Sequence, residues 1–280
     1  MDLYLLQISV AWCRCDLRVN DVPVFEDDGS DRGRIDLERP VTHLLWSGDN
    51  ALSITLSPIP VIEPASVVLL DDARVECEIV LIRRREGERG GARLAAMQFV
   101  GAGLRLGDPG ASVRVGEGVV AHVLRATPES LLAWSQVRLA DAFPRWSWTS
   151  GLVMPSTAET RDAVMAAYVQ LREAADRRDS PFVRAALAEN TREVQLGFDC
   201  DETEARSILG VEDLVGDPQT VALPVPSDAR LDVVGYGRLA RLLDARGNSA
   251  LCFHEKGRGL MTYVDLFLAN LPGRGLVAVR

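Results

Sequence analysis

The side chains best suited to acid–base chemistry lie in the last third of the sequence, at His254, Tyr263 and Asp265, with Tyr168 further upstream. A histidine exchanges its proton near neutral pH, and a neighbouring carboxylate can act with it as an acid–base pair. Side chains alternate between the two faces of a strand, so Tyr263 and Asp265 share a face. A pair of His254 with Asp265, lined by both tyrosines, is therefore one hypothesis, and a structural histidine is the alternative.

Metal chemistry needs more ligands than the sequence supplies at suitable spacing. Cys13 and Cys15 share one face of a predicted strand, but a thiolate zinc site needs two further ligands. His254 and the glutamate after it are not followed by the second histidine of a zinc protease, and residues 27–31 lack the ligand alternation of a calcium loop. We predict buried cysteines, an acidic turn and no metal site.

The glycines and cations of the chain do not indicate a nucleotide cofactor. Gly101, Gly103 and Gly107 lack the strand-glycine-helix context of a dinucleotide-binding loop and fit a hairpin connection instead. A phosphate-binding loop of the Walker type needs a lysine after its glycines, and the one lysine of this sequence, Lys256, is not in that context. We therefore expect no bound cofactor.

Four aromatic residues gather where the two halves of the chain are expected to join: Trp134, Phe143, Trp146 and Trp148. Large aromatic side chains that also carry a polar group suit contact surfaces. We interpret them as interface residues, between the two halves, toward a partner or as a sugar platform. The internal interface is the favoured interpretation, because packing between domains also needs aromatic anchors.

The charge of this 280-residue chain restricts its partners. The formal net charge is −9, and no basic stripe is present to bind phosphate backbones, so we predict no nucleic-acid partner. An acidic surface suits a protein partner that is itself basic. The sequence does not determine the oligomeric state.

Cysteine usage and the first residues indicate the compartment. The five cysteines are odd in number and scattered, which predicts a reducing compartment. The apolar N-terminal run contains Asp2 and Gln7 and lacks a basic start, so it does not match a secretion signal. No stretch reaches the ~18 apolar residues of a membrane span. We expect a cytoplasmic protein without a membrane partner.

The first part of the chain, residues 1–125, has the hydrophobic pattern of strands. Short runs alternate apolar and polar residues between turn signals, as in residues 74–83, where Val75, Cys77 and Ile79 share one face. This pattern predicts a domain that is an antiparallel β-sandwich.

The second part, residues 126–280, has a different period. A helix is predicted from Thr127-Pro128, and further helices are predicted from residue 156, from residue 180 and over residues 201–209. Antiparallel strands are then expected over residues 238–243, 250–254, 260–269 and 275–280. Helices followed by an antiparallel sheet make the predicted fold class of the whole chain α+β.

The first part contains two stretches of interest, Leu17-Arg-Val-Asn-Asp-Val-Pro-Val and residues 41–56. Together they resemble a sequence motif of galactose-binding-like jelly-roll domains. In those sandwiches a short V-N-G-x-x-V strand is followed by a loop that runs into G-x-N-x-L-x-V. The resemblance implies a sandwich, and it suggests a carbohydrate-binding module as one function.

The second part has an element order similar to that of nuclear transport factor 2-like cone folds. A long helix, a turn at Arg177-Arg178-Asp179, another helix and a curved sheet ending in Gly275-Leu-Val-Ala-Val-Arg follow one another. The extra helix at 201–209 and a long loop at 216–230 depart from that order. The resemblance implies a cone with the acid–base candidates at its mouth, and that family contains both enzymes and binding modules.

Three classes of function remain, of which the first is favoured. The protein is predicted to be a non-catalytic cytoplasmic interaction protein, and a bacterial toxin-neutralising (immunity) protein is one specific form, since acidity suits a basic toxin site. The second class makes the C-terminal cone a small-molecule-binding or enzymatic domain. The third makes the N-terminal sandwich a carbohydrate-binding module.

Overall fold

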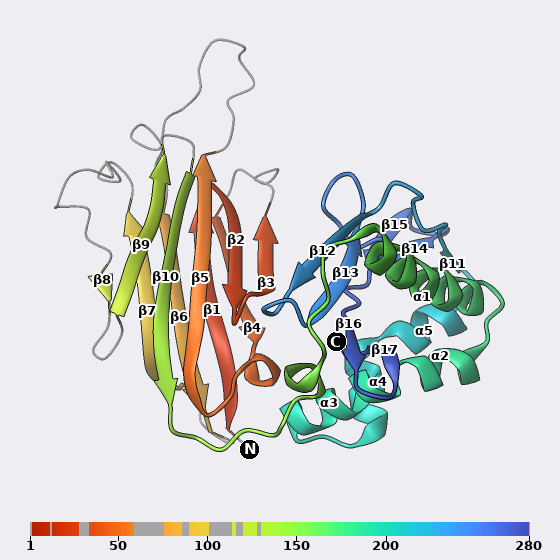
Figure 1. The fold of residues 1–280 in the computed structure, drawn as a ribbon, viewed down its shortest axis with the longest axis horizontal. Coiled ribbons are helices and arrows are strands. Elements are labelled where there is room, and N and C mark those ends of the chain that lie inside the picture. The colour runs from red at the N-terminus through yellow and green to blue at the C-terminus, as the bar shows by residue number, and fades with distance from the viewer. Residues whose placement is uncertain are drawn as a thin grey trace, which may run out of the picture. The chain divides into compact units, whose positions relative to one another are not determined.

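The computed structural model shows a chain that divides into two compact units, Met1–Phe143 and Pro144–Arg280 (Figure 1). The described residues are 2–11, 13–27, 34–58, 76–85, 90–100, 114–115, 120–127 and 130–279. The predictions made for residues 28–31, for Gly101, Gly103 and Gly107, and for Pro128 fall outside them.

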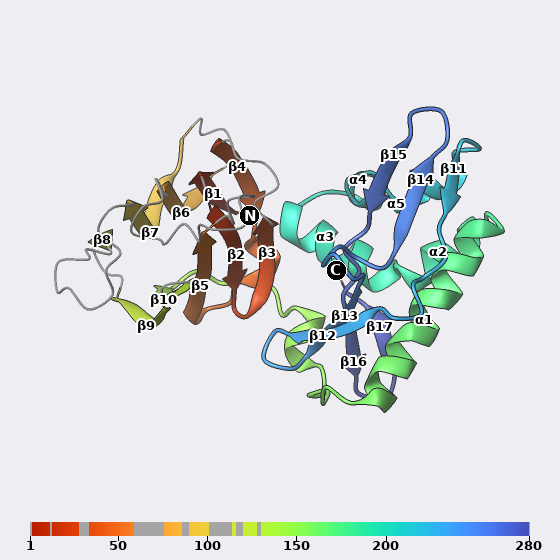
Figure 2. The same ribbon diagram turned by 90° about the horizontal axis from the view of Figure 1, so that it is seen from above.

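The first unit contains two antiparallel sheets in a sandwich-like arrangement, seen from above in Figure 2. One has the order β4-β1-β6-β7-β8 and consists of β1 (Leu3–Ala11), β4 (Arg34–Pro40), β6 (Glu76–Arg84), β7 (Ala92–Val100) and β8 (Arg114–Val115). The other has the order β3-β2-β5-β10-β9 and consists of β2 (Cys13–Val19), β3 (Val22–Asp27), β5 (Gly48–Pro58), β9 (Val120–Thr127) and β10 (Ser130–Leu139). The predicted antiparallel sheets of the N-terminal half are confirmed.

Alternation along β1 gives the first sheet one fully buried face, whereas the other face carries the polar residues Gln7 and Ser9 together with the buried residues Leu5 and Ala11. Tyr4, Leu6, Ile8 and Val10 are each at most 2% exposed, whereas Gln7 is exposed. Full burial of an aliphatic side chain stabilises the fold by about 1.5–3 kcal/mol. The register of β1 is therefore strongly determined, because a shift by one residue would expose all four core side chains.

Strand β10 stands where a helix from Thr127 was predicted, and that prediction is wrong. Ala133 and Val137 are buried while Gln136 and Arg138 are exposed, which is a period of two. β10 pairs with β5 along one edge and with β9 along the other. Two neighbouring strands thus satisfy its backbone groups, and this pairing outweighs the local pattern of a helix start.

The first unit ends with residues that are bonded to its earlier strands. Asp141 accepts a hydrogen bond from the Tyr4 hydroxyl (2.6 Å) and forms an ion pair with Arg83 (3.1 Å). The ring of Phe143 lies against that of Tyr4, with centroids 5.0 Å apart. These contacts keep the segment after β10 on the first unit. The units consequently separate after Phe143, and not between residues 125 and 126 as predicted.

Two buried asparagines connect the turn between β2 and β3 to the start of β5. Asn20 has a φ of +49°, a left-handed conformation that asparagine tolerates. Its Nδ2 donates to Asn50 Oδ1 (2.8 Å) and to the carbonyl of Leu44 (2.7 Å), and its Oδ1 accepts from the N–H of Ala51 (2.8 Å). Asn50 also donates to the carbonyl of Trp46 (2.8 Å). Both asparagines belong to the stretches that resemble the jelly-roll motif, and both stabilise turns.

Replacing Asn50 by alanine should destabilise the first unit by about 2–4 kcal/mol, because Asn20 Nδ2 would lose one of its two acceptors and the backbone N–H and carbonyl of Trp46 would lose their bonds to Asn50. Urea unfolding followed by circular dichroism measures this loss. The control is Ser53→Ala on the same strand, which should change stability by less than about 0.5 kcal/mol. Equal midpoints for the two variants would contradict the role given to the asparagine pair.

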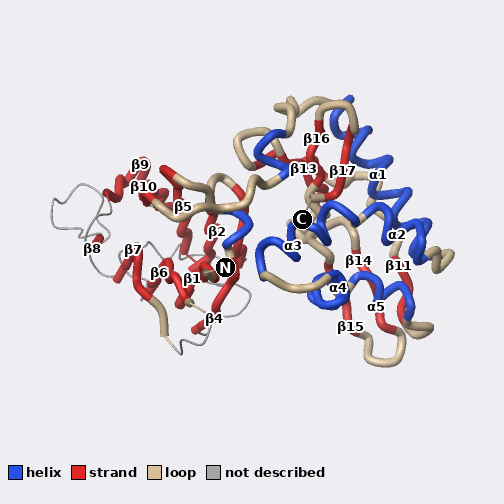
Figure 3. Tube along the Cα trace, turned by 90° about the horizontal axis from the view of Figure 1, so that it is seen from below, coloured by secondary structure: helices blue, strands red, loops and turns tan. Residues whose placement is uncertain are grey.

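The second unit contains helices and two antiparallel sheets, shown from below in Figure 3. The helices are α1 (Ala158–Asp176), α2 (Ser180–Ala186), α3 (Ala188–Phe198), α4 (Glu202–Leu209) and α5 (Val211–Gly216). One sheet has the order β11-β14-β15, with β11 (Thr220–Ala222), β14 (Cys252–Glu255) and β15 (Leu260–Tyr263). The other has the order β12-β13-β16-β17, with β12 (Arg230–Val234), β13 (Leu239–Leu243), β16 (Leu268–Leu271) and β17 (Gly275–Ala278). The α+β fold class is confirmed.

Three helices of the second unit, α1, α2 and α4, begin at residues whose side chains cap them: Thr157, Asp179 and Asp201. Asp201 accepts hydrogen bonds from the N–H groups of Thr203 and Glu204, and Glu204 bonds back to the N–H of Asp201, which forms a capping box at the start of α4. The helix predicted from residue 180 is two helices that meet at Leu187. No helix in the described part of the chain is long and apolar enough to cross a membrane.

Candidate functional site

Tyr168 is the most deeply buried of the predicted acid–base residues. Its side chain is 0% exposed, and its hydroxyl donates to the carbonyl of Leu266 (2.6 Å) and accepts from the N–H of Leu242 (3.1 Å). Burial raises the pKa of this phenol, because the charged form would be desolvated. Tyr168 thus connects α1 to β13 and to the chain before β16, which is a structural role.

The other three acid–base candidates lie on or beside the sheet β11-β14-β15. His254 on β14 and Tyr263 on β15 point to the same side of the sheet, and Tyr263 is 40% exposed. The Asp265 carboxylate lies 3.8 Å from the guanidinium of buried Arg241. Among the described contacts, no hydrogen bond or ion pair joins Asp265 to His254. The structure therefore pairs Asp265 with Arg241 instead of assembling the predicted acid–base pair.

The predicted interface aromatics are divided between the two units. Trp134 belongs to β10 and Phe143 to the end of the first unit. Trp146 and Trp148, in the second unit, are 0% and 1% exposed, and the Trp148 ring lies next to the turn at Gly235. These two tryptophans are core side chains and do not present a surface to a partner or a sugar.

The cysteines of the first unit are buried thiols. Burial raises the pKa of Cys13 to about 12. A hydrogen bond with Cys77, together with burial, raises the pKa of Cys15. Protonated thiols are poor metal ligands. Within the described ranges, no group of three or more histidine, cysteine or acidic side chains is placed to hold a metal ion.

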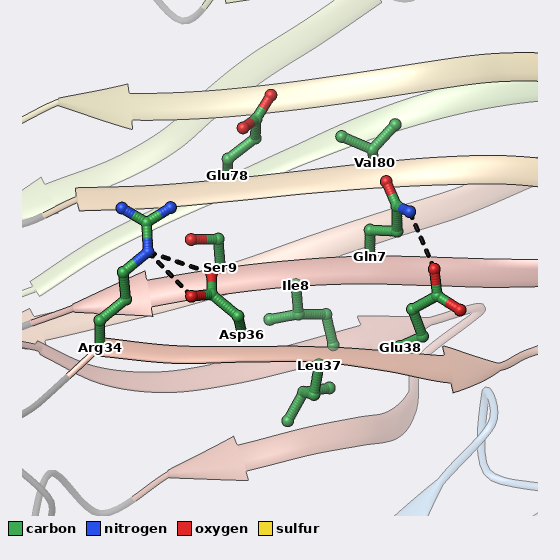
Figure 4. Close-up of a pocket in the computed structure, with 9 residues that line it drawn as sticks. All are labelled: Gln7, Ile8, Ser9, Arg34, Asp36, Leu37, Glu38, Glu78 and Val80. Atoms are coloured by element: carbon green, nitrogen blue, oxygen red, sulfur yellow. Dashed lines mark hydrogen bonds and ion pairs between the residues drawn. The ribbon is translucent and has the colours of Figure 1, made fainter. Parts of the chain in front are cut away.

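The outer face of β4-β1-β6 carries a groove of about 520 Å³ (Figure 4). Strand register places Ser9 of β1 between Asp36 of β4 and Glu78 of β6, and it places Gln7 beside Glu38. One row of polar side chains therefore crosses three strands, and a second row joins Glu38 to Gln7 and ends at the buried Val80, while Ile8 points into the core. The groove is thus a mainly polar surface with apolar side chains, including Val80, in its lining.

The groove carboxylates are held by neighbouring donors. The bonds are Gln7 Nε2 to Glu38 Oε1 (2.9 Å), Arg84 Nη2 to Glu38 Oε1 (3.0 Å), Arg34 Nε to Asp36 Oδ2 (3.0 Å) and Arg93 Nη2 to Glu78 Oε1 (3.2 Å). A hydrogen bond from Ser9 and the Arg34 guanidinium lower the pKa of Asp36. Hydrogen bonds from Gln7 and an arginine lower the pKa of Glu38. Both carboxylates are therefore ionised at neutral pH.

The residues that line the groove carry more negative than positive charge, although each carboxylate also pairs with an arginine. Its lining residues include three carboxylates, one guanidinium (Arg34) and no aromatic ring. The Arg34 and Arg93 side chains are 58% and 62% exposed, so their ion pairs are weak and can exchange with cations from outside. Among the described side chains of the first unit, none is an exposed aromatic that could stack on a sugar. The groove thus favours cationic groups over carbohydrate.

A second carboxylate cluster lies in the other unit and was not identified from the sequence. Glu189 of α3 is 9% exposed and accepts hydrogen bonds from the Ser147 hydroxyl, from Arg192 Nε (2.7 Å) and from Arg274 Nη1 (2.8 Å). Burial acts to raise the pKa of Glu189, but these three donors outweigh it and lower the pKa to about 2. Glu193, one turn further, accepts the N–H of Ser147 (2.6 Å). The cluster binds α3 to two distant segments.

The Glu189 cluster predicts a specific loss of stability in acid. Because the pKa of Glu189 is lowered from 4.5 to about 2, its contribution is complete above pH 4.5 and is lost as the pH falls from there toward pH 2. Glu189→Gln should cost about 1–3 kcal/mol at pH 7 and reduce the slope of stability against pH in that range. Thermal unfolding from pH 7 to pH 2 measures both effects.

The control for this prediction is Glu173→Gln on α1, where the carboxylate is 53% exposed and pairs with Arg177. It should leave the pH profile unchanged, since exposed ion pairs contribute little. Identical profiles for Glu189→Gln and the wild type would show that the cluster does not stabilise the unit.

Comparison with known proteins gives no relative: no family model, no curated protein and no solved structure matches this chain. The resemblances to jelly-roll and nuclear transport factor 2-like domains therefore stay predictions. The function has to be inferred from the geometry of the described residues.

The groove residues were not identified from the sequence, although one signal for them exists. Residues 34–38 alternate, with Ile35 and Leu37 less exposed than the charged residues between them. That alternation indicates a strand. It does not indicate that Asp36 lies beside Ser9, since strand pairing alone brings those two residues together.

Proposed function

We propose that this protein is a non-catalytic binding protein whose first unit receives a basic segment of a protein partner in the groove of β4-β1-β6. The observation that carries the proposal is the arrangement of Asp36, Glu38 and Glu78 on both sides of β1, around a groove of about 520 Å³. Guanidinium groups bind carboxylates through paired, charge-assisted hydrogen bonds. Arginine side chains of a partner would enter the groove and replace the exposed internal arginines.

The charge of the chain supports the same proposal. The net charge of −9 favours approach of a basic partner over a long range at low salt. The lowered pKa values of Asp36 and Glu38 keep the groove charged in mildly acidic as well as neutral solution. A cytoplasmic protein that neutralises a basic toxin, as an immunity protein does, is the specific form of this proposal that the acidity suits.

The alternative functions have less support. The cone hypothesis needs Tyr168, His254 and Asp265 around one cavity, but the Tyr168 hydroxyl is bonded to two backbone groups and Asp265 is paired with Arg241. The carbohydrate hypothesis needs an aromatic platform, and none lines the groove. Binding of a basic protein is therefore the function that the geometry favours.

Fluorescence anisotropy with a fluorescein-labelled nona-arginine peptide tests the proposal. The variant carries Asp36→Asn, Glu38→Gln and Glu78→Gln, which remove the groove charges and keep the side-chain shapes. It should bind the peptide at least about tenfold more weakly than the wild type at physiological salt, because three charge-assisted contacts are lost.

The matched control carries Asp162→Asn, Glu173→Gln and Asp176→Asn on α1, where the carboxylates are exposed and also pair with arginines. Both variants change the net charge by the same three units. The control should bind within about twofold of the wild type. Equal weakening in both variants would mean that only net charge attracts the peptide, and it would overturn the groove as the binding site.

A further inference from the structure

Strand β15 is an edge strand that exposes apolar side chains. Leu260, Met261 and Tyr263 are 53%, 43% and 40% exposed. β15 is the last strand of the sheet β11-β14-β15, and in the part of the chain that the structure describes no strand pairs with its other side. A short edge of exposed apolar residues is a place where a further strand can add.

The backbone groups that point away from β14 can be identified. The N–H of Val264 donates to the carbonyl of Leu251 (2.9 Å), which makes these two a hydrogen-bonded pair in the register of β14 and β15. Hydrogen-bonded and non-hydrogen-bonded pairs alternate along an antiparallel ladder. Thr262 is therefore bonded to β14, whereas the N–H and C=O groups of Met261 and Tyr263 point to the open edge.

We propose that this edge pairs with β15 of a second copy of the chain, antiparallel, so that Met261 lies opposite the second copy's Tyr263. A two-fold axis perpendicular to a sheet places one residue opposite its own counterpart, and in this register that residue is Thr262. Met261 and Tyr263 of each copy then exchange backbone hydrogen bonds with the other copy. The two three-stranded sheets become one continuous sheet.

Of the two neighbouring symmetric registers, the one centred on Met261 is excluded by backbone conformation. It would place Met261 opposite its own counterpart and would require Gly259 to continue the ladder opposite the second copy's Tyr263. Gly259 has a φ of +65°, which is a left-handed conformation and not that of a strand. The register centred on Thr262 uses only residues that are already extended.

The charges at the two ends of β15 select a second copy as the occupant. Lys256 and Arg258 precede the strand, and the Arg258 side chain is 73% exposed and pairs with Glu255 (3.3 Å). Asp265 follows it and is 69% exposed. Antiparallel pairing brings the basic end of each copy beside the acidic end of the other, at both ends of the interface. The edge is thus complementary to itself in charge as well as in hydrogen-bond pattern.

Sedimentation velocity at concentrations from about 1 to about 500 µM tests this inference. The range extends to high concentration because an interface made by one four-residue strand from each copy is expected to be weak. The wild type should show a monomer–dimer equilibrium. Met261→Lys adds a charge at the centre of the interface and should raise the dimer dissociation constant at least about tenfold. Met261→Pro removes one outward N–H without touching the ladder to β14 and should do the same.

Two further variants complete the test. Ile208→Lys adds a lysine at another exposed apolar position, 50% exposed on α4, and should leave the equilibrium unchanged. Arg258→Glu places like charges beside the second copy's Asp265 and should weaken the dimer most at low salt. Circular dichroism confirms that each variant is folded. A wild type that stays monomeric throughout, or a dimer that persists in either Met261 variant, overturns the inference and leaves the groove of the first unit unaffected.

Discussion

The pairing of β1 with β4 on one side and β6 on the other is the constraint on which the first unit depends. The register that sends Leu6 and Ile8 into the core also sends Gln7 and Ser9 to the outer face, where they meet acidic residues of both neighbouring strands. A shift by one residue would exchange the two sets of side chains. Core packing and the groove therefore cannot change independently. The hydrophobic burial that stabilises the sheet also fixes the spacing of the carboxylates.

Polar side chains that are buried or partly buried hold further segments in place in both units. The Asn20–Asn50 pair fixes the turns at one end of the second sheet, and Asp141 holds the end of the first unit against Tyr4. In the second unit Glu189 joins α3 to two distant segments. Each connection links residues far apart in the sequence through hydrogen bonds that are costly to leave unmade.

Elements with a clear hydrophobic period can be predicted from the sequence. The prediction fails where pairing with distant strands determines whether a segment is a helix or a strand. The apolar residues at every second position of β1 and β6 and the three-and-four spacing in α1 indicate the correct elements, because each element has one face that is buried in a core. The segment of β10 looks like a helix start at Thr127, yet its neighbours β5 and β9 make it a strand. The candidate sites show the same limit. Asp36, Ser9 and Glu78 are distant in sequence and are adjacent only through strand register. His254 and Asp265 are close in sequence, but Asp265 pairs with Arg241 instead of His254.

Hydrogen exchange of the whole protein, measured by mass spectrometry with and without the nona-arginine peptide, tests the central claim most directly. Binding in the groove should slow exchange in the peptides that contain β1 and β4, where β4 is the edge strand of its sheet, and should leave the helices of the second unit unchanged. Slowed exchange confined to the second unit, or spread evenly over the acidic surface, would contradict the assignment of the groove as the binding site.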